Sequence, residues 1–298
     1  MSTETVTAGD REIEISNADK VLFPGDGITK LDLARYYAQV ADTALPHYRD
    51  RPLSLQRFPD GIGESGFFQK NTPDYFPDWI ERVDLPKEGG TVTHAIANEA
   101  ATLVYLADQG CITLHLALAR ADSPKHPDRM VFDLDPSDED FGKVQEAASA
   151  VRDALDARGL ASFVSATGSR GLHVVLALDG SVDVDALRPF ARGLAAEVAE
   201  AHPDLATTEQ RKDKRGDRVL IDTFRTAYGQ TAVGPYTVRA RRGAPVATPL
   251  RWDEALASDM TPDRYTIGSV MRRLGQTEDP WKTIGDDAID ARKLAESD

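Results

Sequence analysis

The sequence predicts an α/β protein whose central sheets are mixed or largely antiparallel and flanked by helices. Two kinds of segment support this: alternating apolar stretches joined by short turns, and stretches with apolar residues at helical spacing. The composition agrees, because 41% hydrophobic and 28% charged residues are typical of a soluble globular protein. A chain of 298 residues can bury a sizeable core, and we expect a single domain over 1–298 made of two closely packed lobes.

Several segments carry apolar residues at the spacing of a helix. They cover residues 29–45, 98–106, 144–155, 185–200 and 264–274. Thr29 is expected to cap the first helix and Asn98 the second, because their side chains can accept a backbone N–H bond. Gly110 and Gly159 are expected to end the second and third helices. Residues from about 285 to 298 are expected to form a mobile tail.

Strands are predicted where apolar residues alternate or run together. They cover residues 112–119, 130–135, 161–166, 172–178, 218–224 and 236–242. In 112–119 the isoleucine and leucines share one face, and His115 lies on the other. In 236–242 Arg239 and Arg241 share a face, where they either neutralise phosphates or face water.

The charge is unevenly distributed along the chain. A net charge of −14 argues by itself against a nucleic-acid partner. Residues 205–245, however, hold nine Lys and Arg against four Asp and Glu, which suits a phosphate-rich ligand. A solvated charged loop explains the same segment equally well.

Cysteine usage and hydropathy restrict the class of protein. Cys111 is the only cysteine, so the chain has no disulfide framework and no thiolate metal cluster. No apolar run approaches the ~20 residues that a membrane helix needs, and the N-terminus lacks the regions of a secretory signal. These features predict an intracellular, cytoplasmic protein with no membrane partner.

Two carboxylates interrupt the apolar stretch "MVFDLDPS". On a strand Asp133 and Asp135 project side by side, while Phe132 and Leu134 face the core. Two such charges repel by about 4 kcal/mol at an effective dielectric of 20, so the fold needs a cation between them or a proton on one. Carboxylate oxygens suit Mg²⁺ or Mn²⁺. The alternative is an exposed edge strand with two solvated acids.

Asp222, in the apolar stretch "RVLIDTF", is the candidate for a third carboxylate. A lone acid in an apolar strand also needs a partner, and metal sites for phosphoryl transfer usually use a third carboxylate. By itself this position carries little information.

The turn "TGSRG" has the composition of an anion site. Gly168 and Gly171 allow positive φ and leave backbone N–H groups to point at an anion. Thr167 and Ser169 add hydroxyls, and Arg170 adds a planar cation that suits phosphate. An ordinary hairpin with a surface arginine is the alternative, and the aspartates just upstream favour phosphate binding.

Aromatic residues stand in the glycine-bounded stretch "GFFQK". We expect one of Phe67 and Phe68 to be core and the other to stack on an unpaired base. From the residues alone, His115 is an ordinary surface histidine.

These stretches together resemble a known family. "ADKVLFPGDGITKLDLARYY", "GFFQKNTPDYFPDW", "MVFDLDPS" and "TGSRGLHV" resemble, in order and wording, the polymerase domain of bacterial ligase D, of the archaeo-eukaryotic primase-polymerase superfamily. The resemblance covers nearly the whole chain and implies a primase-polymerase fold. It also implies template-dependent nucleotidyl transfer in DNA repair, such as gap filling and end extension in non-homologous end joining, with ready use of ribonucleotides.

The resemblance further implies roles for the residues that match the family's motifs. Two divalent ions, Mn²⁺ or Mg²⁺, are implied on the catalytic residues Asp133, Asp135 and Asp222. The incoming nucleotide is implied on Thr167, Ser169, Arg170, Gly171, His173, Arg215, Arg225 and Arg239. A primer-terminus role is implied for His115, and template contacts for Arg51, Phe67 and Phe68. A pocket for the 5′-phosphate across a gap is implied for Asn17, Lys20 and Lys30.

The implied partners are NTPs or dNTPs and DNA with gaps or broken ends that bear a 5′-phosphate. A separate DNA ligase, an end-binding protein such as Ku and a place on the nucleoid are also implied. The sequence departs from the family at Arg170, where Lys is common, and at Thr167, where Ser is common. It lacks a Lys-x-Asp-Gly ligase motif, so the resemblance is to the polymerase part without ligase or nuclease domains.

Two alternatives stay open. "VFDLDPS" also resembles the start of a haloacid-dehalogenase-like phosphatase, in which the first Asp is a nucleophile. That family has Thr or Val where Ser137 stands here. The other alternative is a non-catalytic DNA-end-binding module whose carboxylates hold a structural ion.

Overall fold

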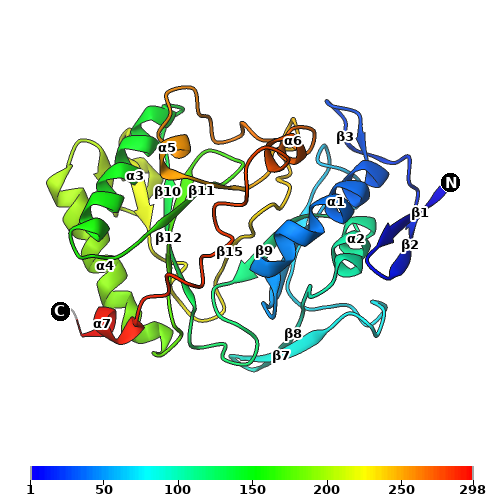
Figure 1. Ribbon diagram of the computed structural model, residues 1–298, viewed down its shortest axis with the longest axis horizontal. Coiled ribbons are helices and arrows are strands. Elements are labelled where there is room, and N and C mark those ends of the chain that lie inside the picture. The colour runs from blue at the N-terminus through cyan, green and yellow to red at the C-terminus, as the bar shows by residue number, and fades with distance from the viewer. Residues whose placement is uncertain (1, 297–298) are drawn as a thin grey trace. The chain divides into compact units, whose positions relative to one another are not determined.

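The computed structural model describes residues 2–296, and the chain divides into two compact units (Figure 1). Unit 1 comprises Met1–Ala117, Val233–Ala247 and Tyr265–Glu278. Unit 2 comprises Leu118–Ala232, Thr248–Arg264 and Asp279–Asp298. Each unit combines segments that are distant in the sequence, and each has a hydrophobic core of its own.

The helices of unit 1 are α1 (Lys30–Tyr48), α2 (Ala100–Asp108) and α6 (Val270–Leu274). Its strands are β1 (Thr3–Ala8), β2 (Arg11–Ser16), β3 (Val21–Phe23), β4 (Ile28–Thr29), β5 (Leu53–Arg57), β6 (Phe67–Gln69), β7 (Arg82–Lys87), β8 (Gly90–Ala95) and β9 (Cys111–Ala117). The strand β5 lies between β6 and β9 in an antiparallel sheet, and β1–β2, β3–β4 and β7–β8 are antiparallel pairs. The helices α1 and α2 pack against each other, and their apolar faces contribute to one core with β5 and β9.

The helices of unit 2 are α3 (Phe141–Asp156), α4 (Val184–Ala201), α5 (Trp252–Ala255) and α7 (Ala291–Ala295), with a 3₁₀ turn at Lys212–Lys214. Its strands are β10 (Arg129–Asp135), β11 (Phe163–Ala166), β12 (Leu172–Ala177), β13 (Ala206–Thr207), β14 (Val219–Asp222) and β16 (Thr248–Leu250). They form one sheet in the order β13-β14-β10-β12-β11-β16, in which only β13 and β14 are parallel neighbours. β15 (Thr231–Val233) lies where the chain passes from unit 2 to unit 1.

The two faces of the unit 2 sheet are covered differently. The helices α3 and α4 pack against β10 and β14 on one face, where Phe132 and Leu134 are fully buried. On the other face Val131 and Val175 join a small apolar cluster with Trp281. Because Asp133 and Asp135 share the face of Val131, they continue that face beyond the apolar cluster.

Local signals in the sequence explain most of the elements. The side chain of Thr29 accepts a bond from the Asp32 N–H, and Asp32 accepts one from the Thr29 N–H, which makes a capping box at the start of α1. Gly110 and Gly159 follow the ends of α2 and α3, as predicted, and both have positive φ. The prediction of a mixed, largely antiparallel α/β fold is confirmed.

Three local predictions are wrong. The N-cap of α2 is Glu99, because the Asn98 side-chain oxygen accepts a bond from the Asp50 N–H, while its NH₂ group donates to the Asp50 and Glu81 carboxylates. Residues 236–242 form tight turns with a single bridge from Val238 to Val246, so Arg239 and Arg241 share no strand face. The predicted helix at 264–274 is reduced to α6.

None of the helices in residues 2–296 combines the length and apolarity that crossing a membrane requires. Near the C-terminus, Ala291 and Leu294 of α7 are buried, and α7 contacts α4. The mobile tail and the close packing of two lobes stay predictions.

Candidate active site

Strands of unit 2 place polar side chains in a row across the sheet. Asp133 on β10 pairs with Asp222 on β14 and, on its other side, with His173 on β12. His173 in turn pairs with Ser165 on β11. Directly paired residues of antiparallel strands share a face, and Asp135 shares it by alternation. Asp133, Asp135 and Asp222, which we call the carboxylate row, therefore lie on the face that α3 and α4 do not cover.

The turn between β11 and β12 is held against the end of β10. Gly168 has a φ of +66°, as predicted, but Gly171 does not have positive φ. Gly171 is required for another reason, because a Cβ there would lie 2.0 Å from the Leu134 carbonyl oxygen. Thr167 is buried, and its hydroxyl donates to the Gly171 carbonyl at 3.0 Å. That hydroxyl closes the turn, while Ser169 and Arg170 at its tip are partly exposed.

Asp133 is largely buried, and a histidine and an arginine side chain contact its two carboxylate oxygens. Its Oδ1 lies 3.3 Å from His173 Nε2, and its Oδ2 lies 3.4 Å from Arg225 Nη2. Burial by itself raises the pKa of the Asp133 carboxyl, but the charge and hydrogen bond of His173, followed by those of Arg225, outweigh burial and lower this pKa to about 2. Asp133 is therefore a carboxylate at neutral pH.

Asp135 is more exposed and is held by two arginines. Its Oδ1 accepts a bond of 3.0 Å from Arg170 Nη2, and its Oδ2 lies 3.5 Å from Arg215 Nη1. Arg215 is itself buried and donates to the Glu209 and Gln210 carbonyls. The repulsion expected between neighbouring carboxylates is thus offset by arginine and histidine side chains.

The donor set of the carboxylate row suits a hard divalent ion. Oxygen ligands on one face are what Mg²⁺ and Mn²⁺ prefer. As the side chains stand, no group of three or more His, Cys, Asp or Glu within residues 2–296 is placed to hold a metal ion. The Oδ1 of Asp222, for example, accepts a bond from the Phe224 N–H. The three carboxylates have the right chemistry for the ion and lie on the same face of the sheet. In this structure, however, their oxygens contact other protein groups.

The aromatic residues predicted at the template lie in unit 1. Phe67 and Phe68 on β6 are 47% and 60% exposed, so the expectation that one of them is core is wrong. The Phe68 ring contacts the His115 ring edge to face at 5.4 Å. Arg57 lies over Phe67 and donates to the Tyr75 hydroxyl, which adds a third exposed ring.

The basic residues predicted at the 5′-phosphate lie close together in unit 1. The Lys20 N–H bonds to the Asn17 carbonyl, and the Lys30 N–H bonds to the Lys20 carbonyl. The Lys30 ammonium is buried and bonds to Asp108 at 3.1 Å, whereas Lys20 forms a more exposed pair with Asp60 at 2.7 Å. Because the Lys30 ammonium is buried in its pair with Asp108, Lys20 and Asn17 are the better candidates for the predicted phosphate contact.

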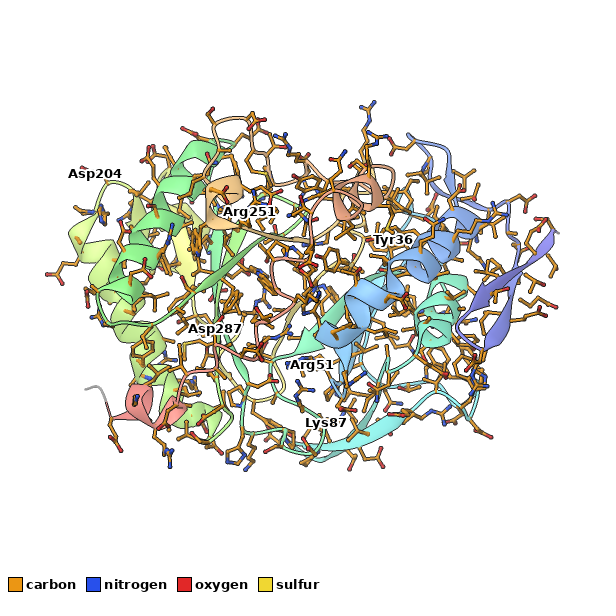
Figure 2. The ribbon with its side chains drawn as sticks, in the orientation of Figure 1. Tyr36, Arg51, Lys87, Asp204, Arg251 and Asp287 are labelled. Carbon is orange, nitrogen blue, oxygen red and sulfur yellow. The ribbon has the colours of Figure 1, made fainter. Side chains whose placement is uncertain are left out.

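Arg51 is not on the surface. Its side chain, labelled in Figure 2, is 1% exposed and donates to the backbone carbonyls of His47 and Ala117. This burial contradicts the predicted template contact, and the bonds assign Arg51 a structural role in unit 1. Arg239 also lies in unit 1, where its N–H bonds to the Pro245 carbonyl.

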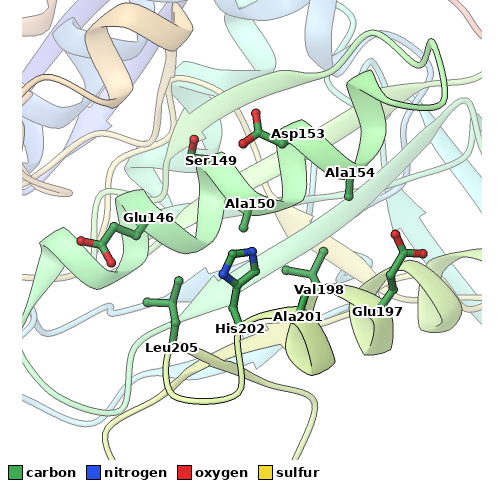
Figure 3. A pocket seen from close by; sticks show the side chains of 10 residues that line it. All are labelled: Glu146, Ser149, Ala150, Asp153, Ala154, Glu197, Val198, Ala201, His202 and Leu205. Atoms are coloured by element: carbon green, nitrogen blue, oxygen red, sulfur yellow. The ribbon is translucent and has the colours of Figure 1, made fainter.

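A groove of about 470 Å³ lies between α3 and α4 (Figure 3). Glu146 and Asp153 of α3 and Glu197 of α4 give it an acidic rim, and Ala150 and Val198 line its apolar part. Both helices cover the face of the sheet opposite to the carboxylate row. The groove is therefore separate from the predicted chemistry.

Sequence reasoning missed three residues near the predicted sites. Tyr75 lies within "GFFQKNTPDYFPDW" and Arg57 shortly before it, and the tyrosine among polar residues in "NTPDYF" was the available signal. Asp108 neutralises Lys30 from 78 residues away, and no local pattern indicates that pairing.

Comparison with known proteins decides the family. The family described as "LigD, primase-polymerase domain" matches residues 29–281. The chain belongs to this family. Its members are nucleotidyltransferases and generally depend on metal ions. The match places "VFDLDPS" inside a primase-polymerase domain, and the phosphatase alternative rested on that stretch alone.

The chain is similar to curated LigD proteins over most of its own length. It is 32% identical over 297 residues to the multifunctional non-homologous end joining DNA repair protein LigD of Mycobacterium tuberculosis, covering 97% of this chain and 39% of that protein. It is 30% identical over 272 residues to the bifunctional LigD of Bacillus subtilis, covering 91% of this chain and 44% of that protein. The chain thus spans less than half the length of these relatives.

A solved structure agrees with the fold. The polymerase domain from Mycobacterium tuberculosis ligase D in complex with DNA superposes with a TM-score of 0.86 at 32% identity. The alignment covers 93% of this chain and 99% of that one.

Proposed function

We propose that this chain catalyses template-dependent nucleotidyl transfer, filling gaps and extending DNA ends during repair such as non-homologous end joining. The observation that carries the proposal is the register of β10, which places Asp133 between Asp222 and His173 on an uncovered face. Membership of the LigD primase-polymerase family and the DNA in the similar structure support it. Ribonucleotides are proposed to be used readily.

The carboxylates of Asp133, Asp135 and Asp222 would hold two divalent ions, Mn²⁺ or Mg²⁺. When bound, such ions lower the pKa of a 3′-hydroxyl and neutralise charge on the leaving pyrophosphate. In the transfer, a bond forms between the 3′-oxygen and the α-phosphorus, and the bond from the α-phosphorus to the bridging oxygen breaks.

The protein's part is to position the reactants. Arg170 and Ser169, at the tip of the turn, are exposed enough to bind the triphosphate, and guanidinium binds phosphate oxygens well. His173 and Arg225 hold the Asp133 carboxylate in place. Such positioning supplies a large part of the acceleration in phosphoryl transfer.

The nucleic-acid contacts are proposed on unit 1. Phe67 and Phe68 would stack on template bases, with His115 near the primer terminus. Lys20 and Asn17 would bind a 5′-phosphate across a gap. A DNA ligase and an end-binding protein such as Ku are proposed partners on nucleoid DNA in the cytoplasm.

Primer extension on a gapped duplex with a 5′-phosphate tests the proposal. In Mn²⁺ with NTPs, the Asp133→Asn variant should add nucleotides about 10²-fold more slowly than wild type. Losing one group that stabilises the charge of a transition state typically slows a reaction by this factor or more. The matched control is Asp213→Asn, an exposed acid paired with Arg211, which should behave as wild type.

Two results would contradict the proposal. Equal rates for Asp133→Asn and wild type would remove the assigned role. A wild-type protein that binds the gapped duplex in a mobility-shift assay, yet adds no nucleotide with any metal, would instead be the non-catalytic end-binding module.

A further inference from the structure

Every carboxylate oxygen of Asp133 and Asp135 faces a cationic or hydrogen-bonding side chain. His173 and Arg225 take the two oxygens of Asp133, and Arg170 and Arg215 take those of Asp135. These oxygens are the ones that a divalent ion would use. An ion that uses these oxygens therefore competes with these side chains.

We propose that Arg170 is the side chain that moves, and that it couples cation binding to triphosphate binding. Without nucleotide, Arg170 neutralises Asp135. When a nucleoside triphosphate arrives, Arg170 transfers to the phosphates and leaves the Asp135 carboxylate to the ion. This inference rests on the proposed function and assigns Arg170 a second task, as a positioning residue.

The surroundings of the four side chains favour Arg170 for the release of Asp135. Arg225 is nearly as exposed, at 37%, but its ion pair is with Asp133. Arg215 is fixed by two further bonds to backbone carbonyls, and its contact with Asp135 is the longest of the four. His173 is buried within β12. Arg170 lies at the tip of a turn, and its side chain is 41% exposed. It can therefore rotate without breaking any bond to the backbone that holds the turn.

The chemistry of the exchange is favourable in one direction. A carboxylate paired with arginine near the surface contributes little stability, because water competes for both groups. A triphosphate offers several charged oxygens to the same guanidinium. A nucleotide that releases Asp135 raises the affinity of the protein for the ion. Because coupling between two ligands is reciprocal, the bound ion raises the affinity for the nucleotide by the same factor.

Mn²⁺ binding without nucleotide or DNA gives a direct readout that needs no turnover. Electron paramagnetic resonance measures free Mn²⁺ in the presence of the full chain. The Arg170→Gln variant should bind Mn²⁺ about 10-fold more tightly than wild type, within the usual range of coupling between sites. Mn²⁺ should also raise the melting temperature of the variant more than that of wild type.

A control separates the direct contact from the general effect of charge. Lys214→Gln removes one positive charge from an exposed side chain of the basic segment 205–245, and in residues 2–296 Lys214 makes no ion pair with the carboxylate row. Its Mn²⁺ affinity should stay within about twofold of wild type, because exposed charges are screened. Equal Mn²⁺ affinities for Arg170→Gln and Lys214→Gln would overturn the inference.

The aspartate variants distinguish this failure from failure of the proposed function. Asp133→Asn and Asp135→Asn should each lose Mn²⁺ binding. If they bind Mn²⁺ as wild type does, the metal site is elsewhere and both proposals fail. If they lose binding while Arg170→Gln gains none, only the coupling through Arg170 is wrong. Circular dichroism of each variant checks that the fold is kept.

Discussion

The two units each hold charged groups proposed for a ligand, and both supply those groups with counter-ions from the protein. In unit 2 the charges are the carboxylates of Asp133 and Asp135, and the counter-ions are arginines and a histidine. In unit 1 the charges are lysines, and the counter-ions are Asp60 and Asp108. The signs are reversed, but the arrangement is the same.

The pairs differ in burial, and burial decides which of them can exchange partners. The side chains of Lys30 and Asp108 are 8% and 9% exposed, whereas those of Lys20 and Asp60 are 35% and 73% exposed. Removing one partner of a buried pair leaves an uncompensated charge in the interior, while a surface pair is already shared with water. The buried pair should act in folding, and the exposed pairs should be available to ligands.

Breaking the buried pair should give the largest change in stability. Lys30→Met leaves the Asp108 carboxylate with Ser16 and Gln109 as its partners among residues 2–296. We expect the free energy of unfolding to fall by about 3 kcal/mol, the lower end for a broken buried pair. Urea denaturation at pH 7 measures it.

The double variant sharpens this prediction. Lys30→Met with Asp108→Asn removes both charges and keeps an oxygen for the Ser16 N–H, so it should recover about 1–2 kcal/mol of the loss. If Lys30→Met alone costs under about 0.5 kcal/mol, the pair is not buried in solution as it is here.

Local patterns were enough to predict the strands that carry the carboxylate row. The i, i+2 spacing fixed the common side of Asp133 and Asp135, and the apolar stretch around Asp222 predicted its strand. Both are properties of short segments. The register that sets Asp222 opposite Asp133 joins strands 89 residues apart, and the sequence suggested it only through the need for a third carboxylate.

Two of the predictions that failed involve partners distant in the sequence. Asn98 has a capping side chain, but its oxygen accepts a bond from the Asp50 N–H and its NH₂ group donates to the Asp50 and Glu81 carboxylates. Arg51 has the charge of a nucleic-acid contact, but the carbonyls of His47 and Ala117 take its guanidinium. A sequence pattern shows which groups need a partner and does not show which partner the fold supplies.

The second prediction concerns acid and the unit 2 carboxylates. The pKa of Asp133 is lowered to about 2 in the folded protein, below its ordinary value of 3.8. A lowered pKa stabilises the fold above the ordinary value, and this stability is lost as the pH falls through the folded value. The contribution should therefore be complete at pH 5 and decline between pH 4 and pH 2.

Comparison with Asp133→Asn isolates this contribution, because the other carboxyl groups titrate alike in both proteins. The difference in unfolding free energy should shrink by about 1 kcal/mol between pH 5 and pH 3. Urea denaturation at the two pH values measures it. A constant difference would mean that His173 and Arg225 do not stabilise the charged form.

The exposed pair of unit 1 should give the smallest change in stability and a clear change in binding. Lys20→Met breaks only the surface pair with Asp60, so unfolding free energy should change by less than about 1 kcal/mol.

If Lys20 exchanges Asp60 for a 5′-phosphate, the variant should lose most of its preference for phosphorylated over unphosphorylated gaps. In a plot of log affinity against log salt concentration, the slope for the variant should also be smaller in magnitude by about one. Fluorescence anisotropy on the two gapped duplexes measures both. A variant that keeps the full preference for the phosphate would show that exposure alone does not make an ion pair exchangeable here, and the contrast between the two lysines would then have to be explained by something other than burial.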